Sequence, residues 1–280
     1  MKVTLWGTRG SLASAGARTA RYGGNTSCVQ VEGADGSLLV LDAGTGIRGL
    51  GAKGLETKRV DLLLTHLHMD HIQGLGFFGP LYTPGSEVHI WGPASTTLHL
   101  REQVARYLSP PLFPVRLRDL PCELTLHDVP RSEFEIGTLK ITASLVCHPG
   151  PTLGYRVSEN GHTVAYLPDH EPALGCRRFP EQGEWTSGFE LAQGVDLLIH
   201  DAQYTEPEYQ SHIGWGHSSY RQALEFARIA RVKRLVTFHH DPSHDDAAIF
   251  RLIRSSRALD LPFTVVAGAE GASFEVGEGS

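Results

Sequence analysis

The run Thr65-His66-Leu67-His68-Met69-Asp70-His71 is the most informative part of this sequence. Three imidazoles and one carboxylate lie directly after the apolar run 60–64, which predicts a short buried strand. Ligand sites of α/β sheets form where strands end and loops begin. Imidazole nitrogens and carboxylate oxygens are the ligands that Zn²⁺ and related cations prefer. A surface turn that is His-rich by accident is the alternative, and the density of ligand-type residues favours a metal site.

Three later residues repeat this placement after an apolar run. His148 follows 139–147, Asp169 follows 163–167, and His239 follows 234–238. Each residue by itself would be an ordinary polar loop residue. All three lie, like the first run, at the carboxyl end of an apolar run.

The spacing His-x-His-x-Asp-His, followed in order by a lone His, an Asp and a late His, resembles the signature of the metallo-β-lactamase-fold hydrolases. This resemblance implies an α/β (α+β) fold, the four-layer αβ/βα sandwich of two mixed β-sheets. It also implies two divalent metal ions, with Zn²⁺ as the first expectation and Mn²⁺ or Fe as alternatives. Carried over to this chain, one ion would be held by His66, His68 and His148. The other would be held by Asp70, His71 and His239, with Asp169 bridging the two.

The same resemblance suggests residues for the chemistry. A hydroxide between the metals would be the nucleophile, and Asp70 could orient or deprotonate the attacking water. Gly216-His217-Ser218-Ser219 and Leu198-Ile199-His200-Asp201-Ala202 are similar to loops of the phosphodiesterase branch. They make His217 the expected general acid and His200 a second catalytic candidate; capping of a helix is the alternative for His217. His170 and His240 are candidates for orienting ligands, with solvated loop positions as the alternative.

Two Gly-rich turns near the amino terminus, at 6–11 and 22–27, are similar to those of phosphoribosyl cyclic phosphodiesterases. A Gly-rich turn is a weak signal, because it is most often only a tight turn. The turn 41–46 is also family-like, and its Asp42 is expected to brace the metal loop without binding metal.

Composition bounds the remaining possibilities. The chain has 280 residues, a net charge of −6 and a hydrophobic fraction of 41%, which describe a globular protein and argue against coating of nucleic acid. No apolar stretch is long enough to span a bilayer, and the first residues lack the pattern of a signal peptide. The four cysteines are scattered and are expected to be reduced thiols, so we expect a cytoplasmic protein.

Periodicity predicts a mixed α/β chain without repeats or linkers, hence one hydrolase domain over 1–280. Helices are expected at 95–108, starting at an N-cap cluster 95–97, at 218–231 and at 243–259. A surface loop near the site is expected at 171–186. Strands are expected at 3–6, 28–32, 38–42, 61–65, 88–91, 124–129, 139–146, 154–158, 163–167, 195–200, 234–238 and 263–266.

The sequence therefore predicts a dinuclear metal-dependent hydrolase, specifically a phosphodiesterase that cleaves a small or cyclic phosphodiester. A small anionic substrate is the expected partner, a homodimer is possible, and neither nucleic acid nor a membrane is expected. The first alternative is a tRNA 3′-processing endonuclease, although the segment after Asp169 lacks a long basic arm. The others are a thioesterase or lactamase, and a metal-bearing binding or sensing module without turnover.

Overall fold

The computed structural model describes residues 1–55, 57–176 and 178–277. Within these residues, fourteen strands form two mixed sheets of seven. In the first sheet, β3 to β6 run parallel, and β1 is antiparallel to both of its neighbours. Its strands lie in the order β14 (Ser273–Glu275), β1 (Lys2–Gly7), β2 (Cys28–Glu32), β3 (Leu38–Leu41), β4 (Arg59–Leu63), β5 (Glu87–Pro93) and β6 (Glu123–Val129).

The second sheet has a similar design. Its strands β10 to β13 run parallel, and β7 to β10 run antiparallel. Their order is β13 (Thr264–Ala267), β12 (Arg234–Phe238), β11 (Leu197–Asp201), β10 (His162–Leu167), β9 (Leu153–Glu159), β8 (Leu139–Leu145) and β7 (Ser132–Ile136).

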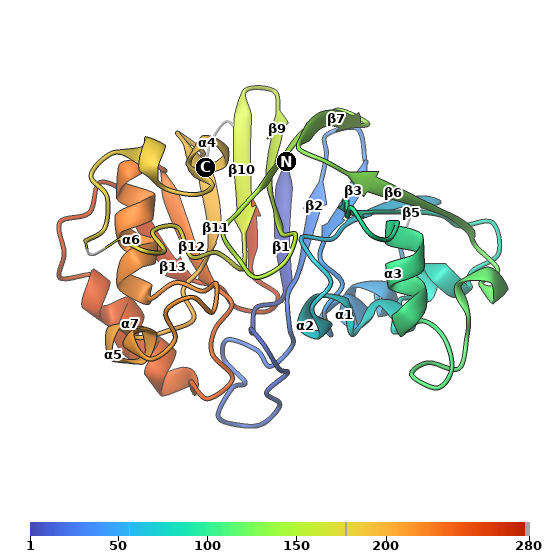
Figure 1. The fold of residues 1–280 in the computed structure, drawn as a ribbon, viewed down its shortest axis with the longest axis horizontal. Helices are drawn as coiled ribbons and strands as arrows, with labels where there is room; N and C mark the ends of the chain where they lie inside the picture. The colour runs from blue at the N-terminus through green and yellow to red at the C-terminus, as the bar shows by residue number, and fades with distance from the viewer. Residues whose placement is uncertain (56, 177, 278–280) are drawn as a thin grey trace.

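Three apolar cores hold the layers together. One core joins the sheets through side chains such as Leu63 and Phe238. The second lies between the first sheet and α1 (Ile47–Ala52), α2 (Met69–Ile72) and α3 (Leu100–Tyr107). The third lies between the second sheet and α4 (Phe189–Ala192), α6 (Tyr220–Ile229) and α7 (Asp246–Ser256), with α5 (Glu206–Gln210) nearby. The chain is thus a four-layer αβ/βα sandwich, as expected, with helices outside both sheets (Figure 1).

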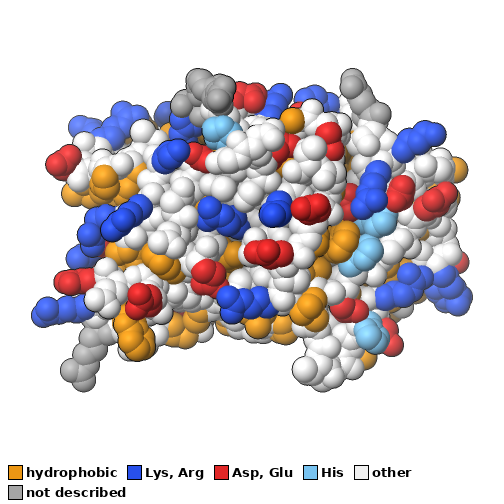
Figure 2. All heavy atoms as spheres, turned by 90° about the horizontal axis from the view of Figure 1, so that it is seen from above, with side chains coloured by type: hydrophobic (Ala, Val, Ile, Leu, Met, Phe, Trp, Pro, Cys, Tyr) orange, Lys and Arg blue, Asp and Glu red, His pale blue; other side chains and the backbone are white. Residues whose placement is uncertain are grey.

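The carboxyl ends of several parallel strands meet at one edge of this sandwich. β10 pairs in register with β11, and β11 with β12, so the loops that follow them are neighbours. Asp42, Asp169 and His239 each lie one or two residues after the end of such a strand. The face seen in Figure 2, looking down from the top of Figure 1, carries Lys and Arg side chains interspersed with Asp and Glu.

The starts of all three predicted helices need correction. α3 begins at Leu100, because His99 is its N-cap and Asp128 accepts the backbone N–H of Leu100. The cluster 95–97, expected as the N-cap, precedes the helix. α6 begins after the N-cap Ser219 and α7 after the N-cap Asp245, whose carboxylate accepts the N–H of Ala248.

Two strands and several short helices were not expected. In β7, Glu133 and Glu135 alternate with less exposed residues at the edge of the second sheet, so apolar periodicity is weak there. β14 is only three residues long. The short helices α1, α2, α4 and α5 also escaped prediction, as did the 3₁₀ helices Leu75–Phe77, Gly79–Tyr82, Leu117–Asp119 and Gly183–Trp185.

Across the residues that the structure describes, we find no helix with the length and apolarity to cross a membrane.

Candidate metal centre

The loop after β4 and the loop after β8 bring three imidazoles together. Nε2 of His148 lies 3.2 Å from Nδ1 of His68, and the ring of His66 lies 4.3 Å from that of His68 and 4.8 Å from that of His148. The three ligand atoms lie within 4.8 Å of one another. This is the first expected ligand group.

A second group forms directly beside it. Oδ2 of Asp70 lies 3.1 Å from Nε2 of His239 and 3.3 Å from Nε2 of His71. Oδ1 of Asp169 lies 2.9 Å from Nε2 of His71 and 3.2 Å from Nε2 of His239. These four residues are buried, and α2 presents two of them, because Asp70 and His71 form its first turn.

Asp169 stands between the two groups. While its Oδ1 faces His71 and His239, its Oδ2 lies 3.7 Å from Nε2 of His66 and 3.7 Å from Nε2 of His148. One carboxylate thus presents one oxygen to each group, which is the geometry that a bridging ligand needs.

Two buried atoms of the cluster lack a hydrogen bond of good geometry within the protein: Nε2 of His66, and Oδ1 of Asp169, which meets His71 and His239 only as ion-pair contacts. Leaving such atoms unpaired is costly unless something else binds them. Both belong to the expected ligand set, and imidazole and carboxylate are the donors that divalent cations such as Zn²⁺ accept. The residues present therefore fit a pair of divalent ions.

The electrostatics of the cluster suit cations. Burial lowers the pKa of His66 well below its usual value, and burial also lowers the pKa of His68 and His148. These rings are therefore neutral, as a metal ligand must be. The net shift is opposite for His71. Burial lowers its pKa, but the nearby carboxylates of Asp169, Asp70 and Asp42 outweigh burial and raise the pKa well above its usual value. The carboxylates thus stabilise positive charge at this point.

Asp42 braces the first ligand run, as the sequence indicated. Its carboxylate accepts hydrogen bonds from the backbone N–H of Thr65 (2.7 Å) and the hydroxyl of Tyr166 (2.9 Å). Its Oδ2 lies 2.8 Å from Nδ1 of His71, and the Thr65 hydroxyl lies 3.0 Å from Nδ1 of His66. Both imidazoles are thereby held with Nε2 toward the cluster, which is how outer partners orient metal ligands.

Other residues orient the remaining ligands. Oε1 of Gln203 lies 2.8 Å from Nδ1 of His239, and the carbonyl of Gly216 lies 2.8 Å from Nδ1 of His148. The backbone N–H of Ser11 donates to Oδ2 of Asp70 at 2.8 Å. These three ligands are thus each held by a partner from a different loop.

The amino-terminal turn approaches the cluster closely at Gly10. A Cβ at this position would lie 2.2 Å from Nδ1 of His239, so a side chain cannot be accommodated there without a shift. His239 itself has a left-handed backbone, with φ +57°, which costs a non-glycine residue energy. The Gly-rich turn 6–11 therefore helps to seat a ligand.

His217 lies next to the second group but is held by a different carboxylate. Its Nδ1 donates to Oδ2 of Asp201 at 2.7 Å, and its ring stacks on His239 with centroids 4.9 Å apart. Burial lowers its pKa, but Asp201 and Asp169 raise it to about 9. A ring nitrogen of His217 also lies within 4.8 Å of ligand atoms of His148 and Asp169, which makes a ligand role the alternative.

His200 does not join the cluster. It is buried, with Nδ1 2.7 Å from the carbonyl of Asp201 and Nε2 2.9 Å from Nδ1 of His170. Burial lowers its pKa to about 4. His240 is also buried, and its Nε2 lies 3.0 Å from the carbonyl of Gly268. The solvated positions considered for His170 and His240 are therefore wrong, since both rings are buried.

Several residues that shape the site were missed or undervalued. Thr65, Tyr166, Ser11 and Gln203 had no assigned role, and Asp201 was named only as part of the loop that contains His200. A signal existed for Asp201 and Gln203, because they follow the strand-like run 195–200 beside the His239 strand. No local pattern marked Tyr166, because its hydroxyl reaches Asp42 across the two sheets.

A polar pocket of about 370 Å³ opens beside His217. It offers hydroxyl, amide, imidazole, indole and carboxylate groups. Its lining residues are Ser11, Gln203, Tyr204, Glu208, His212, Trp215, His217, Asp241 and Ser243.

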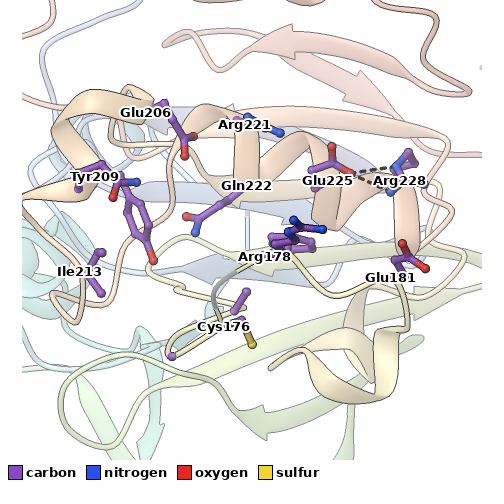
Figure 3. Close-up of a pocket in the computed structure, with 14 residues that line it drawn as sticks. Cys176, Arg178, Glu181, Glu206, Tyr209, Ile213, Arg221, Gln222, Glu225 and Arg228 are labelled. Atoms are coloured by element: carbon purple, nitrogen blue, oxygen red, sulfur yellow. Dashed lines mark hydrogen bonds and ion pairs between the residues drawn. The ribbon is translucent and has the colours of Figure 1, made fainter.

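A separate pocket of about 750 Å³ lies between the segment 173–181 and helices α5 and α6 (Figure 3). Among the described residues that line it, none is an expected metal ligand. The loop 171–186 was expected near the site, but much of it borders this other pocket, and residue 177 lies outside the described residues. Only its beginning reaches the metal side: the buried carboxylate of Glu171 accepts the N–H of Gly216.

The sandwich and the clustered ligands define the class: a hydrolase of the metallo-β-lactamase fold. The chain belongs to the β-lactamase superfamily, whose domain model matches residues 38–240.

Individual relatives agree with this assignment. The chain is 28% identical to the ribonuclease Z of Haloarcula marismortui, over 85% of this chain and 86% of that protein. It resembles a metallo-β-lactamase-fold protein of Bacillus subtilis (TM-score 0.69, 18% identity, 98% of each chain). It also resembles the short form of human tRNase Z (TM-score 0.67, 23% identity, 99% of this chain and 100% of that one). These structural likenesses support the fold.

Proposed function

We propose that this protein is a dinuclear metal-dependent phosphodiesterase. The observation that carries the proposal is Asp169, whose two oxygens face two separate ligand groups, with the Asp201–His217 pair beside them. One group is His66, His68 and His148; the other is Asp70, His71 and His239. We infer Zn²⁺ as the first candidate, with Mn²⁺ or Fe as alternatives.

Divalent ions at these ligands would add positive charge opposite the phosphoryl oxygens and lower the pKa of water at the site. Asp70 offers a carboxylate that can orient the attacking water, while the Ser11 N–H holds that carboxylate in place. The overall reaction adds one water molecule across a P–O bond and yields a phosphomonoester and an alcohol.

His217 has the arrangement of a general acid. Because Asp201 accepts its Nδ1–H, the ring is held with Nε2 free, and the protonated imidazole can deliver its proton to the leaving oxygen. We propose no catalytic role for His200, since both of its ring nitrogens are engaged inside the second sheet.

RNA is the second candidate substrate. The similarity to a ribonuclease Z and to human tRNase Z favours it, and this weighs against the expectation that nucleic acid is not a partner. A small diester remains the first candidate, because the pocket beside His217 carries two carboxylates, Glu208 and Asp241, which would repel further phosphates of a polyanion.

A thioesterase, a lactamase and a metal-bearing sensor are weaker candidates. A thioesterase or a sensor needs no general acid next to the ligand cluster, because a thiolate leaves without a proton and a sensor releases no leaving group. The cluster alone would serve a sensor equally well, so turnover decides between a sensor and an enzyme.

A substrate panel tests the proposal. The metal-reconstituted protein should hydrolyse bis(4-nitrophenyl) phosphate and an alkyl phosphodiester, and should be much slower on 4-nitrophenyl phosphate, a thioester and a lactam. Structured RNA with a 3′ extension belongs in the same panel. Faster turnover of the thioester or lactam than of every diester would refute the phosphodiesterase, and selective RNA cleavage would establish the second candidate.

A further inference from the structure

The two ligand groups open onto pockets of opposite character. The polar pocket borders the second group: Ser11 holds Asp70, Gln203 holds His239, and His217 stacks on His239. On the side of the first group, a small pocket of about 150 Å³ borders His66 and His68. It shares Leu67 and Gln103 with a larger groove of about 440 Å³.

This larger groove is mainly apolar. Its lining includes Leu67 and Met69, the residues that alternate with His68 and Asp70 in the ligand run. Met69 is 52% exposed and Leu112 is 70% exposed, so apolar surface remains open to water right beside the ligands. Exposed apolar surface of this kind typically marks a binding site. The groove is lined by Leu67, Met69, Ile72, Gln103, Arg106, Tyr107 and Leu112.

A phosphodiester carries two organic substituents, and the site offers two places for them. His217 lines the polar pocket, so an alcohol that takes its proton must leave through that pocket. The second place is on the side of the first ligand group, where the small pocket at His66 and His68 shares Leu67 and Gln103 with the groove. Glu208 and Asp241 disfavour an anionic leaving group in the polar pocket.

We propose that the substrate is an asymmetric phosphodiester, with an apolar, ring-sized substituent retained in the groove and a polar, non-anionic alcohol released into the polar pocket. This inference rests on the proposed phosphodiesterase function. In the reaction, a water oxygen bonds to phosphorus, the P–O bond to the alcohol breaks, and His217 protonates the departing oxygen. The products are the alcohol and an apolar phosphomonoester.

A series of diesters with one leaving group tests the groove. Methyl, phenyl and 2-naphthyl 4-nitrophenyl phosphates differ only in the retained substituent. Burial of the added ring should raise kcat/KM by about 10- to 100-fold from methyl to naphthyl.

The variant Leu112→Ser should lower this naphthyl-to-methyl ratio about fivefold. Leu259→Ser is the matched control, because Leu259 is also an exposed leucine (53%) and lies after α7. It should leave the ratio unchanged.

Binding gives a second readout that does not depend on turnover. Methyl-, phenyl- and 2-naphthylphosphonate carry the retained substituent on a P–C bond that water does not cleave. Titrated by calorimetry into the metal-loaded protein, they should bind progressively tighter to the wild type. The gain should shrink in Leu112→Ser.

The outcomes separate the inference from the function on which it rests. No hydrolysis of any diester would overturn the phosphodiesterase itself. Equal rates and affinities across the series would overturn the groove while leaving the phosphodiesterase intact. A preference for large leaving groups, without one for large retained groups, would also overturn the proposed arrangement.

Discussion

The two sheets supply the proposed metal ligands in different ways. The first sheet contributes four of them, His66, His68, Asp70 and His71, from a single loop and the first turn of α2. The second sheet contributes three, and each follows a different strand: His148 after β8, Asp169 after β10 and His239 after β12. The first four ligands are thus neighbours in the sequence, whereas the other three are brought together by the order of the strands in the sheet.

The outer partners of the ligands follow the same division. Asp42 acts on the first run from the neighbouring strand β3, with which β4 pairs in parallel. On the other side, Gln203 and Gly216 come from loops that the chain reaches only after β11. A local motif can therefore be recognised from spacing, whereas a ligand set assembled by topology depends on how the strands are ordered.

Removal of the bridge is expected to have the largest effect. Asp169→Ala should reduce bound metal from about two ions per chain to fewer than one, because Asp169 faces both groups. His68→Ala, on the local side, should retain about one ion, since the second group remains complete. Elemental analysis of protein purified without chelator measures both, with the exposed Asp119→Ala as control. Two ions in Asp169→Ala would contradict the bridging role.

The next effect concerns catalysis without loss of metal. His217→Ala should lower kcat for an alkyl diester by about 10²- to 10⁴-fold, the usual contribution of a positioned acid. The loss should be much smaller for a nitrophenyl diester, because nitrophenolate leaves without a proton. Steady-state kinetics with both substrates measure the difference, and His212→Ala, in the same pocket, is the matched control.

Two results would exclude that role for His217. Equal losses on both substrates would mean that the ring positions the substrate. A loss of metal in His217→Ala would mean that it is a ligand, as its distance from Asp169 and His148 allows.

Weaker effects should follow when the outer partners change. Asp42→Asn and Gln203→Leu should each weaken metal binding by about 10- to 100-fold. Asp42→Asn should affect both ions, because Asp42 reaches His71 directly and His66 through Thr65. Gln203→Leu should affect only the ion near His239. Competition with a chromophoric chelator measures the affinity for each of the two ions separately. Identical titration curves for the two variants would argue against one variant affecting both ions and the other only one.

The smallest expected effect compares helix starts. Asp245→Ala should lower the free energy of unfolding by about 1 kcal/mol, because Asp245 caps α7. Ser243→Ala, at the start expected from sequence, should change it less, since the Ser243 hydroxyl donates to Asp241 and not to the helix. Urea denaturation measures both. A larger loss of unfolding free energy for Ser243→Ala than for Asp245→Ala would mean that the helix is capped at Ser243, the start predicted from the sequence.

Prediction from sequence succeeded where a signal is local and apolar. β2 and β12 have the predicted bounds. The strands that precede the proposed ligands begin and end within about two residues of their predicted bounds. Prediction failed where an element's start depends on a polar side chain that is distant in the sequence, or where the strand is polar. α3 starts at Leu100 because Asp128, on β6, accepts its N–H, and β7 forms because its edge position tolerates glutamates facing solvent.

The sequence by itself determined the ligand types, their order along the chain and the family's fold, because strand runs and ligand spacing are properties of neighbouring residues. Only the tertiary structure decided which of these side chains lie together in each candidate ligand group and which carboxylate holds His217. It also placed Gly10 against His239 and separated His200 from the cluster. These contacts join loops that become neighbours only when the strands pair. The residues involved are far apart along the chain, so no local sequence pattern predicts the contacts.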